Sequence, residues 1–64
     1  MQFKVGQKVK TKNGIIGIIY QIDENRILLD HYTYTKDYQP FCRVYVGHGC
    51  MMCERQDIKE VIQQ

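Results

Sequence analysis

The stretch Ile15–Asp23 most constrains the fold, because it starts apolar on both faces and is rich in β-branched residues. Successive side chains of a strand point to opposite faces of a sheet, and β-branched side chains favour strands. One face of this strand would carry Ile16, Ile18, Tyr20 and Ile22, and the other Ile15, Gly17, Ile19 and Gln21. The pattern predicts a central, buried strand in which Gly17 lets the chain bend or admits a neighbouring backbone.

Short strand-like segments separated by turn residues occupy most of the remaining chain. They are residues 7–11, 27 to about 32, 41–46 and 50–54. Lys12-Asn13-Gly14 predicts a tight turn, because Asn and Gly tolerate a positive φ. Further turns are expected at residues 23–26 and 47–49. In the first segment Val9 should point away from Lys8 and Lys10.

The segment 27–32 predicts a strand with two different faces. One face would carry Ile27, Leu29 and His31, and the other Leu28, Asp30 and Tyr32. Residues 33–40 lose the apolar alternation, so we expect an exposed excursion between strands. Apolar positions 58, 61 and 62 predict one helical or 3₁₀ turn followed by a brief last strand.

No part of the chain keeps a helical apolar period beyond about two turns, so no long helix is expected. The chain of 64 residues is short enough for one domain at most. We therefore predict a single all-β domain over residues 1–64. Its expected form is a small five-stranded antiparallel barrel with a short 3₁₀ turn before the last strand, since closure removes exposed strand edges.

Two segments resemble the small SH3-like barrels, a superfamily that includes KOW and Tudor-type domains. Gly6-Gln7-Lys8-Val9-Lys10 before Asn13-Gly14-Ile15-Ile16-Gly17-Ile18-Ile19 is similar to their opening hairpin. Arg43-Val44-Tyr45-Val46 followed by Gln56-Asp57-Ile58-Lys59-Glu60-Val61 is similar to their last strands, with the 3₁₀ turn before the final one. The resemblance covers nearly the whole chain and implies partner binding through a loop between early strands and the adjoining aromatic surface.

Charge and cysteine content narrow the class of protein. Nine Lys and Arg against seven Asp and Glu give a net charge of +2, too weak to indicate a nucleic-acid binder by itself. The start of the chain lacks an apolar signal segment, and no apolar run approaches a membrane span, so no membrane association is expected. Three cysteines cannot all pair within one chain, which favours reduced thiols and a cytoplasmic protein. The small size of the chain favours a bacterial or viral origin.

The cysteines could form a metal site instead of packing as buried thiols. The four soft ligands of such a zinc site would be Cys42, His48, Cys50 and Cys53. A strand over residues 50–54 would point Cys50 and Cys53 to opposite faces, which opposes joint chelation. We therefore expect buried thiols with no metal and no cofactor. A redox pair is also disfavoured, because no helix start is present to lower a thiol pKa.

No catalytic residues are expected. A cysteine–histidine pair would need a pocket, and the interior of so small a barrel is filled by side chains. The candidates for such a pair are Cys42 or Cys50 as nucleophile, His48 or His31 as base, and Asp30 or Asp37 to orient it. Residue type alone supports this arrangement, so the sequence favours a protein that is not an enzyme.

Aromatic side chains supply the favoured site. Tyrosine combines apolar area with a polar tip and is enriched at protein interfaces. The predicted partner-binding residues are Tyr32, Tyr34, Tyr38, Phe41 and Tyr45. They indicate a non-catalytic module that docks a protein partner, such as a small regulator or a phage-type inhibitor. Alternatively, Tyr32 or Tyr34 folds back to cap the barrel.

Lysines provide a second binding hypothesis. Lys8, Lys10 and Lys12 form a basic comb that would contact RNA or DNA phosphates, with tyrosines stacking on bases. The same lysines also suit an edge strand that is kept from aggregating, an interpretation that is slightly favoured. The doubly apolar start of the central strand leaves both a monomer and a homodimer open.

Overall fold

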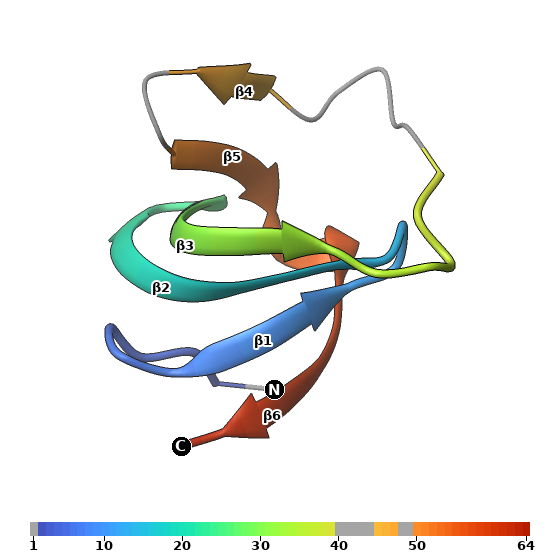
Figure 1. The fold of residues 1–64 in the computed structure, drawn as a ribbon. Helices are drawn as coiled ribbons and strands as arrows, with labels where there is room; N and C mark the ends of the chain where they lie inside the picture. The colour runs from blue at the N-terminus through green and yellow to red at the C-terminus, as the bar shows by residue number, and fades with distance from the viewer. Residues whose placement is uncertain (1, 40–44, 48–49) are drawn as a thin grey trace.

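The computed structural model describes residues 2–39, 45–47 and 50–64. These residues form one antiparallel sheet in the strand order β4-β5-β3-β2-β1-β6 (Figure 1). The strands are β1 (Lys8–Thr11), β2 (Ile15–Asp23), β3 (Arg26–Tyr34), β4 (Tyr45–Gly47), β5 (Cys50–Glu54) and β6 (Ile58–Gln63). A 3₁₀ helix, η1 (Arg55–Asp57), precedes β6. The all-β class, the antiparallel pairing and the 3₁₀ turn before the last strand are confirmed.

The sheet curls so that the last strand pairs with the first (Figure 1). Val9 lies opposite Val61, and the Gln7 side chain donates a hydrogen bond to Gln64 Oε1 at 2.9 Å. β6 is longer than the brief strand that the sequence indicates. In the part of the chain that is described, no helix is long and apolar enough to cross a membrane.

The 3₁₀ helix is hydrogen-bonded to two turns, the β1–β2 turn and the β2–β3 turn. Lys12 N donates to Asp57 O at 2.8 Å, and Arg55 N donates to Asn25 O at 3.0 Å. The buried Asp57 carboxylate accepts a hydrogen bond from Glu54 N at 3.1 Å. Because η1 satisfies backbone groups of both early turns, it fixes where β6 begins relative to β1.

The core lies on the concave face of the curled sheet. β2 contributes Ile15 and Ile19, both fully buried, as the alternation along this strand predicts. The other buried members of the cluster come from β1, β3, β5 and β6: Val9, Ile27, Leu29, Met51, Cys53 and Ile58. Each such side chain contributes about 1.5–3 kcal/mol when it leaves water, so this small cluster is the main source of stability.

A β-bulge in β3 changes the faces expected for His31 and Tyr32. Between two consecutive β2–β3 pairs, β3 carries one residue more than β2, opposite Gly17. His31 occupies the bulge with φ of 50° and is exposed, whereas Tyr32 packs against the core. The prediction that His31 shares the face of Leu29 is therefore wrong, because the extra residue shifts the alternation by one.

A second bulge lies in β2 between Ile19 and Gln21. Tyr20 and Gln21 are both exposed, and the alternation resumes one residue later. Ile22 consequently packs against the core, opposite Ile27. The prediction that Ile22 shares a face with Ile18 is wrong for the same physical reason as at His31.

Gly17→Ala should destabilise the fold by about 1–3 kcal/mol through overpacking. An added Cβ would lie 3.0 Å from Leu29 Cβ and 3.2 Å from Tyr32 Cβ. Neither neighbouring atom can move away by a rotamer change, because both are attached directly to the backbone. Urea denaturation would measure the loss. Gln21→Ala, at an exposed position of the same strand, is the control and should stay within about 0.5 kcal/mol of the parent protein. Equal stability of the two variants would contradict the close approach.

Candidate functional site

Three of the predicted partner-binding tyrosines form one aromatic cluster. The Tyr32 and Tyr34 rings meet edge to face, with centroids 5.9 Å apart, and Tyr34 contacts Tyr38 at 4.5 Å with a tilt of 57°. Both separations lie in the favourable range for aromatic pairs. Tyr34 is 52% exposed and Tyr38 is 36% exposed, while Tyr32 is half-buried against the core. We call Tyr32, Tyr34 and Tyr38 the tyrosine cluster.

A fixed turn holds the outer part of this cluster. Thr35 donates two hydrogen bonds to Gly14 O, from its backbone N and from Oγ1, both at 2.8 Å. Gln39 N donates to Asn13 O at 2.8 Å, and Tyr38 N donates to Thr35 O at 3.1 Å. Residues 33 and 34 belong to β3, so the expected excursion starts only at Thr35. The segment 35–39 is therefore anchored at both ends to the β1–β2 turn.

The β1–β2 turn has the residues that this anchoring requires. Gly14 has φ of +91°, and a Cβ there would lie 2.8 Å from the Tyr38 backbone. Asn13 does not adopt a positive φ but is buried, and its side-chain oxygen accepts a hydrogen bond from Thr11 Oγ1. Thr11 Oγ1 in turn accepts a hydrogen bond from Ile15 N at 3.0 Å. The turn was predictable from Asn13 and Gly14, but its contact with the tyrosine segment was not.

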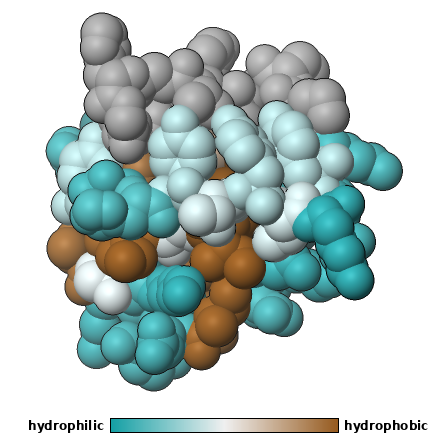
Figure 2. Space-filling view, viewed as in Figure 1, coloured by the Kyte–Doolittle hydropathy of each residue, from teal (hydrophilic) through white to brown (hydrophobic). Residues whose placement is uncertain are grey.

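The other two predicted aromatic residues are not part of the described cluster. Phe41 lies outside the residues that the structure describes. The backbone of Tyr45 belongs to β4, opposite Met52, and its side chain is outside the described part. Figure 2 shows a band of weakly polar residues across the viewed face of the molecule, with apolar residues reaching the surface below it.

The lysine comb is divided between a strand and a turn. Lys8 and Lys10 are half-buried on the face of β1 opposite Val9, as predicted, whereas Lys12 is exposed in the β1–β2 turn. β1 pairs with β2 on one side and β6 on the other, so the interpretation as a protected edge strand is wrong. Glu60 of β6 lies opposite Lys10, which places an acidic residue beside the comb.

Cys53 is a core residue with an inert thiol. It is 1% exposed, and burial raises its pKa to about 12, with further contributions from the nearby Asp57 and Glu54 carboxylates. Cys42 and His48 lie outside the described residues, and of Cys50 only the backbone in β5 is described. Within the described residues, no group of three or more His, Cys, Asp or Glu is positioned to hold a metal ion.

The remaining catalytic candidates are exposed. The His31 side chain is 78% exposed and its Nε2 lies 3.6 Å from Asp30 Oδ2, while Asp30 Oδ1 accepts a hydrogen bond from His31 N at 2.8 Å. Asp37 is exposed in the turn that follows Lys36. These contacts stabilise the β3 bulge, and solvent surrounds the imidazole.

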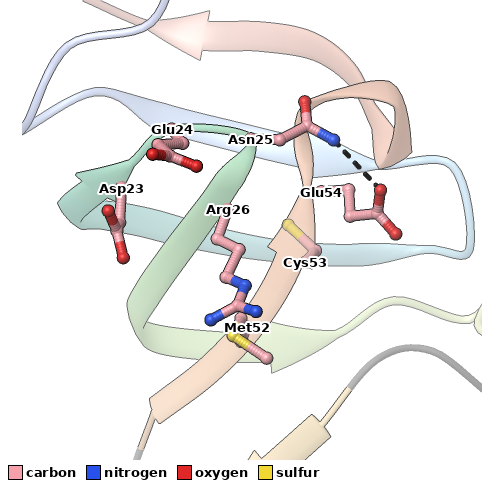
Figure 3. Close-up of a pocket in the computed structure, with 7 residues that line it drawn as sticks. All are labelled: Asp23, Glu24, Asn25, Arg26, Met52, Cys53 and Glu54. Carbon is pink, nitrogen blue, oxygen red and sulfur yellow. Dashed lines mark hydrogen bonds between the residues drawn. The ribbon is translucent and has the colours of Figure 1, made fainter.

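A groove of about 620 Å³ opens beside the β2–β3 turn. Asp23 and Glu24 lie on one side, Arg26 lies between, and Asn25 donates a hydrogen bond to Glu54 at 3.1 Å on the other side (Figure 3). Its complete lining is Asp23, Glu24, Asn25, Arg26, Met52, Cys53 and Glu54. The lining contains no histidine, and its one thiol has a pKa of about 12, so it lacks an activated nucleophile at neutral pH.

Comparisons of the chain with protein-family models, with curated proteins and with solved structures find no match. The tyrosine cluster, the lysines and the polar groove are therefore weighed on their own geometry.

Gly14→Ala should release the segment 35–39 and destabilise the protein by more than Gly6→Ala. Both glycines have a positive φ, +91° and +98°, so both variants carry a similar backbone strain of about 1–2 kcal/mol. Only at Gly14 would the new Cβ also overlap the Tyr38 backbone, since nothing lies within 4 Å of a Cβ at Gly6. Thermal denaturation and the NMR shifts of Tyr34 and Tyr38 would measure both effects. Equal melting temperatures for the two variants would contradict the anchoring.

Alkaline pH should destabilise the protein in part through Cys53. Its folded-state pKa of about 12 lies above the ordinary value of 9.0, so the unfolded chain loses this proton first. The stabilising contribution is complete below about pH 9 and declines as pH rises toward 12, by at most about 1.4 kcal/mol per pH unit. Cys53→Ala removes this contribution while keeping the other titrating groups. Urea denaturation between about pH 8 and pH 11 should therefore show a shallower decline for the variant, and parallel curves would contradict the burial of the thiol.

Proposed function

We propose that this chain is a non-catalytic binding module that docks a protein partner through the tyrosine cluster. The observation that carries the proposal is the exposure of Tyr34 and Tyr38 on a segment anchored by hydrogen bonds to Gly14 and Asn13. Exposed aromatic side chains on a rigid support are the usual energetic centres of protein interfaces.

Anchoring matters because binding must otherwise offset the loss of loop and side-chain freedom. Tyr34 is held between two rings, and the backbone of Tyr38 is fixed through Thr35. The exposed ring faces are thus presented in nearly the conformation that a partner would meet. Each immobilised side chain saves about 0.5–1.5 kcal/mol of ordering free energy on association.

The chemistry around the cluster favours a partner surface without strong charge. Lys36 and Asp37 lie between Tyr34 and Tyr38, and their charges offset one another. Phenol rings offer apolar area, and their hydroxyl groups hydrogen-bond at the rim. The complementary surface would be an apolar side chain flanked by backbone carbonyl or amide groups.

The fold is consistent with the proposed relation to SH3-like barrels. A 3₁₀ turn precedes the last strand, as the resemblance implies, and the last strand pairs with the first, which brings the two ends of the sheet together. A role as a small regulator or phage-type inhibitor fits a short module whose groove lacks an activated nucleophile. The cytoplasm is the proposed location, on the odd number of cysteines.

Nucleic-acid binding through Lys8, Lys10 and Lys12 is the weaker alternative. Glu60 opposite Lys10 lowers the positive potential along the strand, and Lys12 lies in the turn beyond it. The net charge of +2 adds little long-range attraction to phosphates. Docking of a protein surface on the tyrosine cluster does not depend on positive potential, so these two features do not weaken it.

Replacing both exposed tyrosines should abolish partner capture while leaving the fold intact. Tyr34→Ala/Tyr38→Ala removes the exposed rings, and the loss of two interface centres should weaken binding at least about 100-fold. Affinity purification of the tagged protein followed by quantitative mass spectrometry would compare this variant with the parent protein.

Tyr20→Ala is the matched control, because Tyr20 is 39% exposed but lies in the second bulge of β2, away from Ile15 and the tyrosine cluster. It should retain the partner. Circular dichroism would verify that each variant is folded. A folded double variant that still retains the partner would refute docking through the tyrosine cluster.

A further inference from the structure

The outer face of the sheet carries two isoleucines that the core does not use. Ile16 and Ile18 point away from Ile15 and Ile19 and are half-buried, and neither packs against the core cluster. Their positions are separate from the tyrosine cluster, whose members lie on the core side of β3 or in the turn that follows it. Ile16 and Ile18 are neighbours on this outer face, so a molecule docked there would bury the parts of both side chains that solvent still reaches.

A positive charge lies on the β1 side of these isoleucines, and a negative charge lies on the β3 side. Lys8 of β1 is paired in register with Ile18, and Ile18 is paired with Asp30 of β3. Cross-strand partners point to the same face, so Lys8, Ile18 and Asp30 form one row across the sheet. Neighbouring strands are about 4.8 Å apart, which puts the lysine and aspartate backbones about 10 Å apart with Ile18 between them.

We propose that a second copy of this chain docks on this face, related by a two-fold axis that runs along β2. Such an axis lays Ile16 and Ile18 on the partner's Ile16 and the partner's Ile18. It also exchanges the two flanks of the row, so that Lys8 faces the partner's Asp30 and Asp30 faces the partner's Lys8. A row that is positive at one end and negative at the other is complementary to its own two-fold copy.

The arrangement has two ion pairs around an apolar centre. Lys8 has no ion pair within the described residues, so its ammonium group is available to a second molecule. Asp30 Oδ1 accepts a hydrogen bond from His31 N. Asp30 Oδ2 lies 3.6 Å from Nε2 of the exposed His31 imidazole, which can move aside for a second molecule. The aligned packing of two sheets through their faces needs strands within about 30° of each other, which an axis along β2 provides.

The dimer should be weak. The molecule measures 24 × 21 × 20 Å, and one curved face of this size is smaller than the roughly 800 Å² per partner of a standard interface. We therefore expect a dissociation constant on the order of 10–100 µM, near the low end of specific association. Such a dimer would form at high local concentration and would leave the tyrosine cluster accessible.

Charge-reversal variants test the proposal by sedimentation equilibrium of the purified chain over a wide concentration range. Lys8→Asp and Asp30→Lys each turn two attractive contacts into two repulsive ones, so each variant alone should dimerise at least about tenfold more weakly. An equimolar mixture should form heterodimers about as tightly as the parent protein, because every contact in them again joins opposite charges. The introduced carboxylate at position 8 meets the introduced ammonium group at position 30, and the unchanged Asp30 meets the unchanged Lys8. Lys59→Asp, with the same charge change at an exposed site on β6, should not weaken dimerisation.

Three results would overturn the proposal: a parent protein that stays monomeric at every concentration, a dimer insensitive to both reversals, or a mixture that fails to recover association. Because Asp30 also binds His31 N, circular dichroism must show that Asp30→Lys is folded. If it is not, Lys8→Asp and Ile18→Thr decide, since both should weaken the dimer at least about tenfold. If both of these variants dimerise as tightly as the parent protein, the outer face of β2 is not the dimer interface.

Discussion

The pairing of β2 with β3 determines which side chains of these two strands face the core. Two bulges interrupt it, one opposite Gly17 and one at the Ile19–Gln21 step. Each bulge moves the following residues of its strand to the other face of the sheet. The bulge at His31 thereby turns Tyr32 and Tyr34 to the core side, where the returning segment meets them. Without that extra residue both tyrosines would share the outer face with Asp30, and no cluster would form.

The periodicity of the sequence was sufficient to predict the regular parts of the fold. The bounds of β2 and β5 agree with prediction, and so does the 3₁₀ turn before β6, because each segment combines a clear period with a nearby turn residue. The faces of His31, Tyr32 and Ile22 were not predictable from alternation. A bulge depends on contacts between strands, here the space that Gly17 leaves for Leu29 and Tyr32. The alternation within one strand therefore does not predict where a bulge occurs.

The candidate site was predictable in composition but not in form. The number of tyrosines between residues 32 and 38 indicated an aromatic surface, and three of them do come together. Their support comes from a distant part of the sequence: the carbonyl group of Gly14 accepts hydrogen bonds from Thr35, 21 residues later, and that of Asn13 accepts one from Gln39. Asn13 indicates a turn because asparagine tolerates a positive φ, yet here its buried side chain orders the turn by accepting a hydrogen bond from Thr11 Oγ1.

The return of β6 to β1 has a consequence for the order of folding. Gln7 and Gln64 bond across 57 positions of sequence, whereas β2 and β3 are joined by two turn residues. The entropy of closing a loop grows with its length, so the β2–β3 hairpin can form early, and the first and last strands meet only after most of the chain is ordered. In the native state, we expect the long-range pairing of β6 with β1 to open more easily than the local β2–β3 hairpin. Detachment of β6 is a short opening that leaves the hairpin intact, and it briefly exposes the edge of β1 long before the molecule unfolds as a whole.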